Sequence, residues 1–376
     1  MLKFTCEKTP LFSAVAVASR TVAAKSPISV LEGVHVRAEQ DTLSLTGYDL
    51  ENGITVTLPA QVQEEGECVL PPRLFFDIVR KSAEDEISVT VDDQLKVEVK
   101  SGISVFRFSA EKADDYPELP DVDAEEGVRI PQQELRTMIS GTLFSASENK
   151  TRPILTGCLF EVEEHSVTTV AIDGVRLALR RWKTDETLAC AGKKFVAPAA
   201  ALREVEKLLA DTEETAEIVV GRKYIIFRIG DAKLICRIID GEFVDWRKVL
   251  SAAADIRLVA QVGDLTSCLE RVCLMISEKF NSPVRCLFSN NKASFSTATQ
   301  TGAAQDSCPV AGDGRELTIG FNGNFLLEAL RRISDEEVTL SLSNSLSPIV
   351  MTPAGDKDNF SYLILPMRIR EAAEPA

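Results

Sequence analysis

The sequence predicts an α+β protein made of three copies of one domain, each combining two helices with antiparallel sheet. The chain has 376 residues, enough for two or three domains of ordinary size. Two independent sequence markers recur three times, at spacings of 124 to 130 residues. Apolar and polar residues alternate in several segments, which indicates sheets with one buried and one solvated face, and such sheets are antiparallel.

The first marker is a short apolar strand followed by a helix start signal. It occurs in residues 68–80, 195–209 and 317–332. The start signals are Pro71, Pro198 and Asn322, which are 127 and 124 residues apart. Each block therefore predicts a strand leading into a helix at an equivalent place in each copy.

The second marker is a proline that follows a helix and opens a strand. Pro27, Pro153 and Pro283 fill this role and are 126 and 130 residues apart. Either marker alone could recur by chance, but the agreement of both favours three copies of one domain. We expect the domains at residues 1–124, 125–252 and 253–376, with polar, acidic linkers near 121–127 and 251–255.

The same signals place the individual elements. Helices are expected at residues 8–25, 71–83, 131–152, 198–210, 264–280 and 322–334. Alternating strands are expected at residues 42–46, 86–91, 95–99, 224–229, 234–239 and 337–342, with a turn around Asp92 and Asp93. Asp173-Gly174 and Asp240-Gly241 have the composition of tight turns.

Charge is distributed unevenly along this acidic chain. The formal net charge is −15, which argues against a simple basic nucleic-acid binder. The six expected helical segments nevertheless carry a net charge of +6, which leaves −21 for the rest. Basic residues that merely decorate solvated helices are one explanation, and composition alone favours it. Three repeats in register would instead line one surface with helices and attract a polyanion.

No feature of the sequence indicates an enzyme, a metal site or a cofactor. The chain has only two histidines, His35 and His165, and it lacks the common phosphate-binding, nucleophile-elbow and metalloprotease motifs. The nine cysteines are odd in number and form no CxxC pair, so we expect buried thiols in a reducing compartment. No apolar run approaches the length of a membrane span, and we expect a cytoplasmic protein.

The C-terminal segment 362–369 stays apolar almost to the end of the chain. One explanation is a final core strand. The other is an exposed groove that binds a partner peptide, because methionine and leucine beside a proline suit an adaptable pocket. Both hold if the strand ends in the wall of the pocket.

Several long motifs, in order along the chain, resemble one family. They are residues 43–51, 169–178, 240–250, 277–280, 319–322 and 362–368, and the similarity spans residues 2–370. Together with the threefold repeat, they resemble the beta subunit of bacterial DNA polymerase III, the sliding clamp family. This resemblance implies a non-catalytic processivity factor without a cofactor. Its alternative is a peptide-binding scaffold that does not encircle DNA.

The resemblance implies a head-to-tail homodimeric ring, with helices lining the inside and antiparallel sheets outside. Such a ring encircles duplex DNA without sequence specificity and tethers the polymerase to its template. The implied partners are the DNA polymerase III catalytic subunit, the clamp loader and other proteins with a clamp-binding motif. The residues expected to face DNA are Arg20, Lys25, Arg73, Arg80, Lys81, Arg136, Asn149, Lys150, Arg152, Arg203 and Lys207.

The resemblance also implies a pocket for partner peptides between the second and third domains. Its residues would be Leu155, Ile172, Gly174, Val175, Arg176, Leu177, Val244, Lys248, Val249, Asn322, Phe325, Leu346, Pro348, Leu363, Ile364, Leu365, Pro366, Met367 and Arg368. Val175, Val244 and Leu365 depart from a His, a Pro and a Met of the family. Pro153 and Ile154 replace tyrosines that touch DNA in some relatives.

The seam of the ring is implied in the same way. The family pairs an edge strand of domain one with an edge strand of domain three, here residues 103–108 and 292–297. Phe106 would pack near Leu274 and Met275 of the other subunit. Residues 371–376 extend beyond the usual end of the family and are expected to be a frayed tail.

Overall fold

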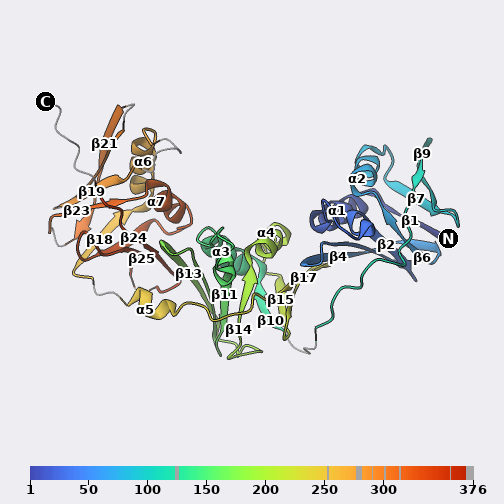
Figure 1. Cartoon of the computed structure of the whole chain (residues 1–376), viewed down its shortest axis with the longest axis horizontal. Helices are drawn as coiled ribbons and strands as arrows, with labels where there is room; N and C mark the ends of the chain where they lie inside the picture. Colours follow the sequence, from blue (N-terminus) through green and yellow to red (C-terminus); the bar gives the residue numbers. More distant parts are fainter. Residues whose placement is uncertain are drawn as a thin grey trace. The chain divides into compact units, whose positions relative to one another are not determined.

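The computed structural model describes residues 1–122, 127–251, 254–276, 282–289, 291–299, 302–312, 315–355 and 357–369. The chain divides into two compact units, Met1–Leu135 with Ala200–Ile238 and Arg136–Ala199 with Ile239–Ala376 (Figure 1). Every strand pairing in both units is antiparallel, as the alternating segments predicted.

Unit 1 contains two sheets, which we call sheets A and B. Sheet A has the strand order β5-β1-β7-β8-β9, and sheet B has the order β10-β15-β16-β17-β4-β3-β2-β6. The strands are β1 (Leu2–Glu7), β2 (Val34–Glu39), β3 (Thr42–Tyr48), β4 (Asn52–Pro59), β5 (Gln61–Glu64), β6 (Gly66–Leu70), β7 (Glu86–Val91), β8 (Lys96–Ser101), β9 (Ser104–Ser109), β10 (Val128–Pro131), β15 (Thr215–Val220), β16 (Tyr224–Ile229) and β17 (Ala232–Arg237).

Unit 2 contains sheets C and D. Sheet C has the order β14-β11-β12-β13-β26-β25-β24-β18-β22, and sheet D has the order β21-β20-β19-β23. The strands are β11 (Gly157–Val162), β12 (Ser166–Ile172), β13 (Arg176–Lys183), β14 (Lys194–Pro198), β18 (Ile256–Gln261), β19 (Val284–Ser289), β20 (Lys292–Thr299), β21 (Gly302–Pro309), β22 (Ala311–Gly312), β23 (Leu317–Phe321), β24 (Glu337–Leu342), β25 (Ile349–Pro353) and β26 (Phe360–Ile364).

The helices follow the threefold repeat. In each copy a strand leads into a first helix, α1 (Lys8–Ala18), α3 (Gln132–Leu143) or α6 (Val262–Cys273), and a later strand leads into a second, α2 (Pro72–Lys81), α4 (Ala199–Leu208) or α7 (Gly323–Leu330). Short helices are α5 (Trp246–Leu250) and the 3-10 turns η1 (Ser19–Thr21), η2 (Ser29–Glu32) and η3 (Pro153–Thr156). The three-domain architecture predicted from the repeat is thereby confirmed.

Local sequence explains where a helix such as α2 begins and ends. Pro72 stands in its first turn, where a missing N–H costs nothing. Phe75, Ile78 and Val79 recur at helical spacing and are buried. Arg80 and Lys81 occupy the last turn, where cations interact favourably with the helix dipole. The helix therefore packs one apolar face, and Phe76 contacts Phe12 of α1 at a ring-centroid distance of 5.0 Å.

The helices are shorter than predicted, and this changes the charge argument. The expected segments 8–25, 131–152 and 264–280 overran their helices, and residues 277–280 lie outside the described part of the chain. The six helices that match the expected segments carry eight basic and seven acidic side chains, a net charge of +1 rather than +6. The surplus cations that are described, including Lys25, Lys150 and Arg152, lie instead in segments that follow a helix.

Two further predictions touch residues that the structure does not describe. The domain boundaries at 124/125 and 252/253 fall at residues 123–126 and 252–253, and the tail 371–376 is also undescribed. These boundaries therefore remain predictions. Among the described helices, none is long and apolar enough to cross a membrane.

Candidate functional site

Among the described residues, exposed apolar side chains occur in both sets of predicted interface residues. Val175, Val244, Val249, Leu346 and Leu365 are exposed and belong to the predicted pocket. Ile103, Val105, Leu274 and Met275 are exposed on or beside the predicted seam. Clusters of exposed apolar side chains mark interaction surfaces more often than single ones do. Both predicted sites thus coincide with surface that would gain from being covered.

An aspartate-anchored turn carries three of the predicted pocket residues, Gly174, Val175 and Arg176. Asp173 follows β12, and its Oδ1 accepts hydrogen bonds from the backbone N–H groups of Val175 and Arg176, each at 3.0 Å. Gly174, which lies between Asp173 and Val175, has φ +98°, a conformation that favours glycine. The turn holds Val175 at the tip, as the Asp-Gly pair predicted.

Four of the predicted pocket residues lie in one buried apolar cluster on sheet C, which we call the apolar floor. Leu155, Ile172, Leu177 and Leu363 belong to it, together with Trp246. Strand β26 pairs with β13 so that Leu363 lies opposite Leu177. Four of the predicted pocket residues therefore form one floor, although they come from distant parts of the chain.

The C-terminal run both completes sheet C and continues to the rim. Residues Phe360–Ile364 form β26, between β25 and β13. Beyond the strand, the N–H of Leu365 donates to the carbonyl of Val175 at 2.9 Å, and the N–H of Met367 donates to the carbonyl of Gly320 at 2.8 Å. The two readings of this segment are thus compatible, because the strand is core and Leu365 is exposed.

Arg176 connects the turn to α7. Its Nε lies 2.8 Å from Asp173 Oδ2, and its guanidinium also pairs with Glu328 of α7. The guanidinium carbon lies 4.1 Å from the centre of the Phe325 ring, a cation–π contact. These contacts bring Phe325 of the third domain beside Arg176 of the second.

The remaining pocket residues are less closely connected. Val244, Lys248 and Val249 lie in and around α5, a helix that the sequence did not predict because five residues are too few to show a period. Asn322 caps α7 by accepting from the N–H of Asn324 at 3.0 Å, and Leu346 is 83% exposed before β25. The described contacts do not connect Asn322, Leu346, Pro348, Pro366 or Arg368 to the apolar floor.

One part of the predicted seam is wrong. Strand β9 is an edge strand of sheet A, as expected for residues 103–108, but residues 292–297 belong to β20, which lies between β21 and β19. The edge beside α6 is β21, whose sequence Gly-Ala-Ala-Gln-Asp-Ser-Cys-Pro lacks the alternation that marks a strand. Phe106 is half-buried against the core of the first domain, while Leu274 is 78% exposed.

The residues expected to face DNA are all exposed. Seven of them, Arg20, Lys25, Arg73, Arg80, Lys81, Arg203 and Lys207, lie in unit 1, and four, Arg136, Asn149, Lys150 and Arg152, lie in unit 2. Arg80 pairs with Asp77 at 2.6 Å and Lys207 pairs with Glu204 at 2.7 Å. Exposed pairs of this kind contribute little to stability, so these cations can still attract an anion.

The thiols are shielded. Seven of the nine cysteines are buried, and Cys190 and Cys273 are half-buried. Burial raises the pKa of Cys6, Cys68 and Cys236 to about 12, which disfavours the reactive thiolate. The two histidines have different partners: His35 of β2 contacts Glu67 at 3.0 Å, and His165 of the β11–β12 turn contacts the carbonyl of Glu186.

Comparison with known proteins identifies the family of this chain. Family models match three consecutive stretches: the N-terminal domain of the DNA polymerase III beta subunit at residues 2–120, its central domain at 129–245 and its C-terminal domain at 247–368. The beta sliding clamp of Staphylococcus epidermidis is 27% identical, over 98% of this chain and 100% of its own length.

Solved structures agree with the sequence comparison. The DNA polymerase sliding clamp of Bacillus subtilis has a TM-score of 0.93 and 26% identity, covering 98% of this chain and 100% of its own. A sliding clamp of Pseudomonas aeruginosa bound to griselimycin has a TM-score of 0.91 and 28% identity, with the same coverage. With all three domain models matched in order, the chain belongs to the DNA polymerase III beta subunit family, the bacterial sliding clamps.

Proposed function

We propose that this chain is a DNA sliding clamp, a non-catalytic processivity factor of the DNA polymerase III holoenzyme that acts in the cytoplasm. Two copies close head to tail into a ring, encircle duplex DNA without reading its sequence, and tether the polymerase. The clamp loader and other proteins with a clamp-binding motif use the same pocket. The observation that carries this proposal is a strand pairing between consecutive domains. It occurs twice within the chain, and the two strands that would form a third such pairing, β9 and β21, lie at sheet edges.

The two pairings within the chain have the same register. In sheet B, β17 pairs with β4 from Cys236 opposite Asn52 to Ala232 opposite Val56. In sheet C, β26 pairs with β13 from Ile364 opposite Arg176 to Phe360 opposite Arg180. Asn52 and Arg176 are equivalent because each opens the fourth strand of its repeat after an aspartate-anchored turn. The repeat thus joins consecutive domains by one rule.

The same rule leaves β9 and β21 at sheet edges, each paired on one side, with β8 and β20 respectively, and without a second strand partner among the described residues. Strand β9 is equivalent to β17 and β26, and β21 is equivalent to β4 and β13. Transferring the register places Phe108 opposite Gly302 and Phe106 opposite Ala304 of a second copy. Pairing them would close a ring through two identical heterologous contacts and would remove both exposed edges.

Burial supports this register over its neighbours. In β9, Phe106 and Phe108 are half-buried, whereas Val105 and Arg107 are exposed. In β21, Ala304 is half-buried and Gln305 is exposed. A slip of one residue would place Phe106 opposite Gln305, on the wrong face. Met275 lies against Gly302, where a Cβ would be 3.4 Å from its Sδ, so it would meet Phe108 at the seam.

Electrostatics suits a ring that slides. The net charge of −15 disfavours nucleic acid over most of the surface, while ten exposed arginines and lysines among the eleven predicted DNA-facing residues supply local positive charge. Contacts to phosphate through long, exposed side chains are sequence-independent and weaken with salt. Tight binding would oppose movement, so the closed ring, rather than affinity, holds the protein on DNA.

The pocket suits a short peptide that carries Leu and Phe side chains. Its floor is apolar and buried, and Arg176 and the backbone of the Asp173 turn supply the few polar groups. Val175 makes the rim more apolar than a His would, and Val244 and Leu365, in place of Pro and Met, keep it apolar. Apolar anchors in such a cleft supply most of the binding energy.

Retention on circular DNA tests the proposal. The protein is loaded onto a closed plasmid, the complex is isolated by gel filtration, and the plasmid is then cut once. A sliding clamp stays on the closed circle and is released after the cut. A scaffold that binds partner peptides without encircling DNA gives equal retention before and after cutting, and that result would reject the ring.

A further inference from the structure

The rim of the pocket formed by α5 depends on contacts outside the pocket. Val244, Lys248 and Val249 flank or belong to this helix, which is only five residues long. Helices of this length are not stable alone in water. Asp245 at its N-cap makes no side-chain capping hydrogen bond. The position of this rim is therefore set by what α5 packs against.

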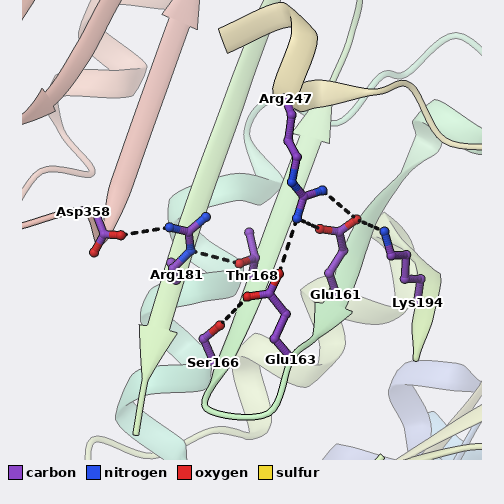
Figure 2. A network of polar contacts seen from close by, with 8 residues as sticks. All are labelled: Glu161, Glu163, Ser166, Thr168, Arg181, Lys194, Arg247 and Asp358. Carbon is purple, nitrogen blue, oxygen red and sulfur yellow. Dashed lines mark hydrogen bonds and ion pairs between the residues drawn. The ribbon is translucent and has the colours of Figure 1, made fainter. Parts of the chain in front are cut away.

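Two neighbouring side chains hold α5 on one face of sheet C. Trp246 is 6% exposed and packs in the apolar cluster with Leu177 and Leu363. Arg247 extends from the next position to the charged end of the same face, as Figure 2 shows. That end carries Glu161 of β11, which lies directly opposite Lys194 of β14. One residue thus fixes the apolar side of the helix and the next fixes its polar side.

The contact between Arg247 and Glu161 is two-pronged. Arg247 Nη2 lies 2.8 Å from Glu161 Oε2 as an ion pair, and Nη1 donates to Oε1 at 3.3 Å. Nη2 also lies 3.4 Å from Glu163 Oε1. The guanidinium carbon lies 4.1 Å from the centre of the Trp246 ring. A planar guanidinium can satisfy the carboxylate and stack on the ring at once, whereas a lysine cannot.

Glu161 keeps its charge despite burial. Its side chain is only 5% exposed, and Lys194 Nζ lies 2.8 Å from Oε1. Burial by itself would raise the pKa of Glu161, but hydrogen bonds from Arg247 and Lys194 outweigh it and lower the pKa below its usual value. A buried ion pair of this kind adds little net stability, yet it strongly disfavours other positions of its partner.

We infer that Arg247 and Glu161 are positioning residues for partner-peptide binding. Neither is one of the predicted pocket residues, and Arg247 stacks on Trp246 at the edge of the apolar cluster. Together they fix α5 and hence the rim residues Val244 and Val249. Holding the rim in place before the peptide arrives lowers the ordering cost of binding. This inference rests on the proposed pocket. It states that the Arg247–Glu161 ion pair on sheet C raises the affinity of the pocket for partner peptides.

The test measures peptide affinity in matched variants of the full chain. The probes are fluorescently labelled griselimycin, which a relative binds, and a labelled peptide bearing Leu and Phe. Arg247→Gln and Glu161→Gln should each weaken binding of the probes about tenfold. Arg247→Lys should bind the probes more tightly than Arg247→Gln but less tightly than the unaltered chain, because lysine keeps the charge but cannot make the two-pronged contact with Glu161. Arg181→Gln is the control, since Arg181 pairs with Asp358 on the same sheet face and not with α5.

Two further measurements separate positioning from general destabilisation. Hydrogen exchange should speed up in residues 243–250 of the Arg247→Gln protein, with the sheet C amides unchanged. In a Trp182→Phe background, the emission of Trp246 should shift toward that of an exposed indole before any probe is added.

The outcomes distinguish this inference from the pocket itself. Failure of the unaltered chain to bind either probe would overturn the pocket and the inference together. Normal binding by both anchor variants, matching the Arg181→Gln control, would overturn the inference and leave the pocket intact. If Arg247→Gln or Glu161→Gln is too unstable for study, the Arg247→Lys variant decides the question. Intermediate affinity of Arg247→Lys would support the inference, and full affinity would show that the two-pronged contact is not needed.

Discussion

Two junctions join consecutive domains: β4 pairs with β17 in unit 1, and β13 pairs with β26 in unit 2. They have similar backbone structure but different exposed side chains. In unit 1, Asp49 Oδ1 accepts from the N–H groups of Glu51 and Asn52, as Asp173 does in unit 2 for Val175 and Arg176. Leu50 and Gly174 both have positive φ at the tip of the turn. The strands that follow pair with the next domain in the same register. The scaffold alone therefore does not create a peptide pocket.

The connectors make the difference. The connector of unit 1 crosses its junction with Tyr116, whose hydroxyl donates to the carbonyl of Thr46 at 3.2 Å, and with Leu119, which packs against Gly53. The connector of unit 2 forms α5 and leaves Val244 and Val249 exposed beside a buried apolar floor. The first junction is covered by its own connector, whereas apolar side chains of the second connector stay exposed.

The largest expected effect comes from charging the open junction. Val175→Glu together with Leu365→Glu should weaken binding of the Leu- and Phe-bearing peptide by about a hundredfold or more, because the peptide would have to bury two carboxylates. Fluorescence anisotropy measures the change. Leu50→Glu alters the equivalent turn of the first junction and should leave affinity unchanged. A large loss in that control would show that the two junctions are not distinct in function.

The next effect concerns the junction between copies. Leu274→Ala with Met275→Ala should weaken the dimer about tenfold to a hundredfold, because both truncations remove apolar area from the seam. Sedimentation at low protein concentration measures the dissociation. Leu74→Ala with Leu50→Ala removes similar exposed area elsewhere and should have no effect. An unchanged dimer in the first variant would count against β9 and β21 as the seam.

A pH dependence should appear in the first junction. His35 stacks on Tyr116 of the connector, and burial lowers its pKa even though Glu67 acts in the opposite direction. The native state therefore favours neutral His35. This stabilisation is present above pH 6.5, the ordinary histidine value, and is lost as pH falls below it.

Hydrogen exchange of residues 110–122 measures this loss. Exchange should speed up on acidification below pH 6.5, and His35→Gln should remove that dependence. The connector of unit 2 contains no histidine in residues 239–250 and should respond less. Equal sensitivity of both connectors would indicate a cause other than His35.

The smallest effect distinguishes the two turns. Gly174→Ala should destabilise the protein by about 1 kcal/mol, because alanine disfavours positive φ and no atom lies near enough to clash. Leu50→Gly should change stability by less than about 0.5 kcal/mol, since relief of strain offsets the greater freedom of the unfolded chain. Urea unfolding measures both. A loss at Leu50 as large as that at Gly174 would mean that the two turns are not equivalent.

Local sequence specified most elements but not their lengths. The proline and asparagine start signals located α2, α4 and α7 to within two residues, because a helix start has a chemical marker. Helix ends were missed where polar residues such as Asn149 and Lys150 continue without glycine. Strand β21 was missed because its eight small or polar residues show no apolar–polar alternation. Helix α5 was missed because five residues are too few to show a helical period.

The pocket could not be assembled from local pattern. Its floor requires Leu177 to lie opposite Leu363, a pairing between strands that are 186 residues apart in sequence. Only the family resemblance predicted that these segments meet. Arg247 and Glu161 escaped prediction for the same reason, since each is an ordinary charged residue until the fold brings them within 2.8 Å.

The most direct test of the central claim is a disulfide across the proposed seam. Arg107→Cys with Ala303→Cys places two thiols at positions that the shared register makes opposite, within bridging distance. Mild oxidation should give a covalently closed dimer, and on circular plasmid that dimer should survive denaturant as a ring linked to DNA. The diagonal control, Arg107→Cys with Gln305→Cys, should cross-link poorly. Efficient closure by the diagonal pair and none by the opposite pair would contradict the account.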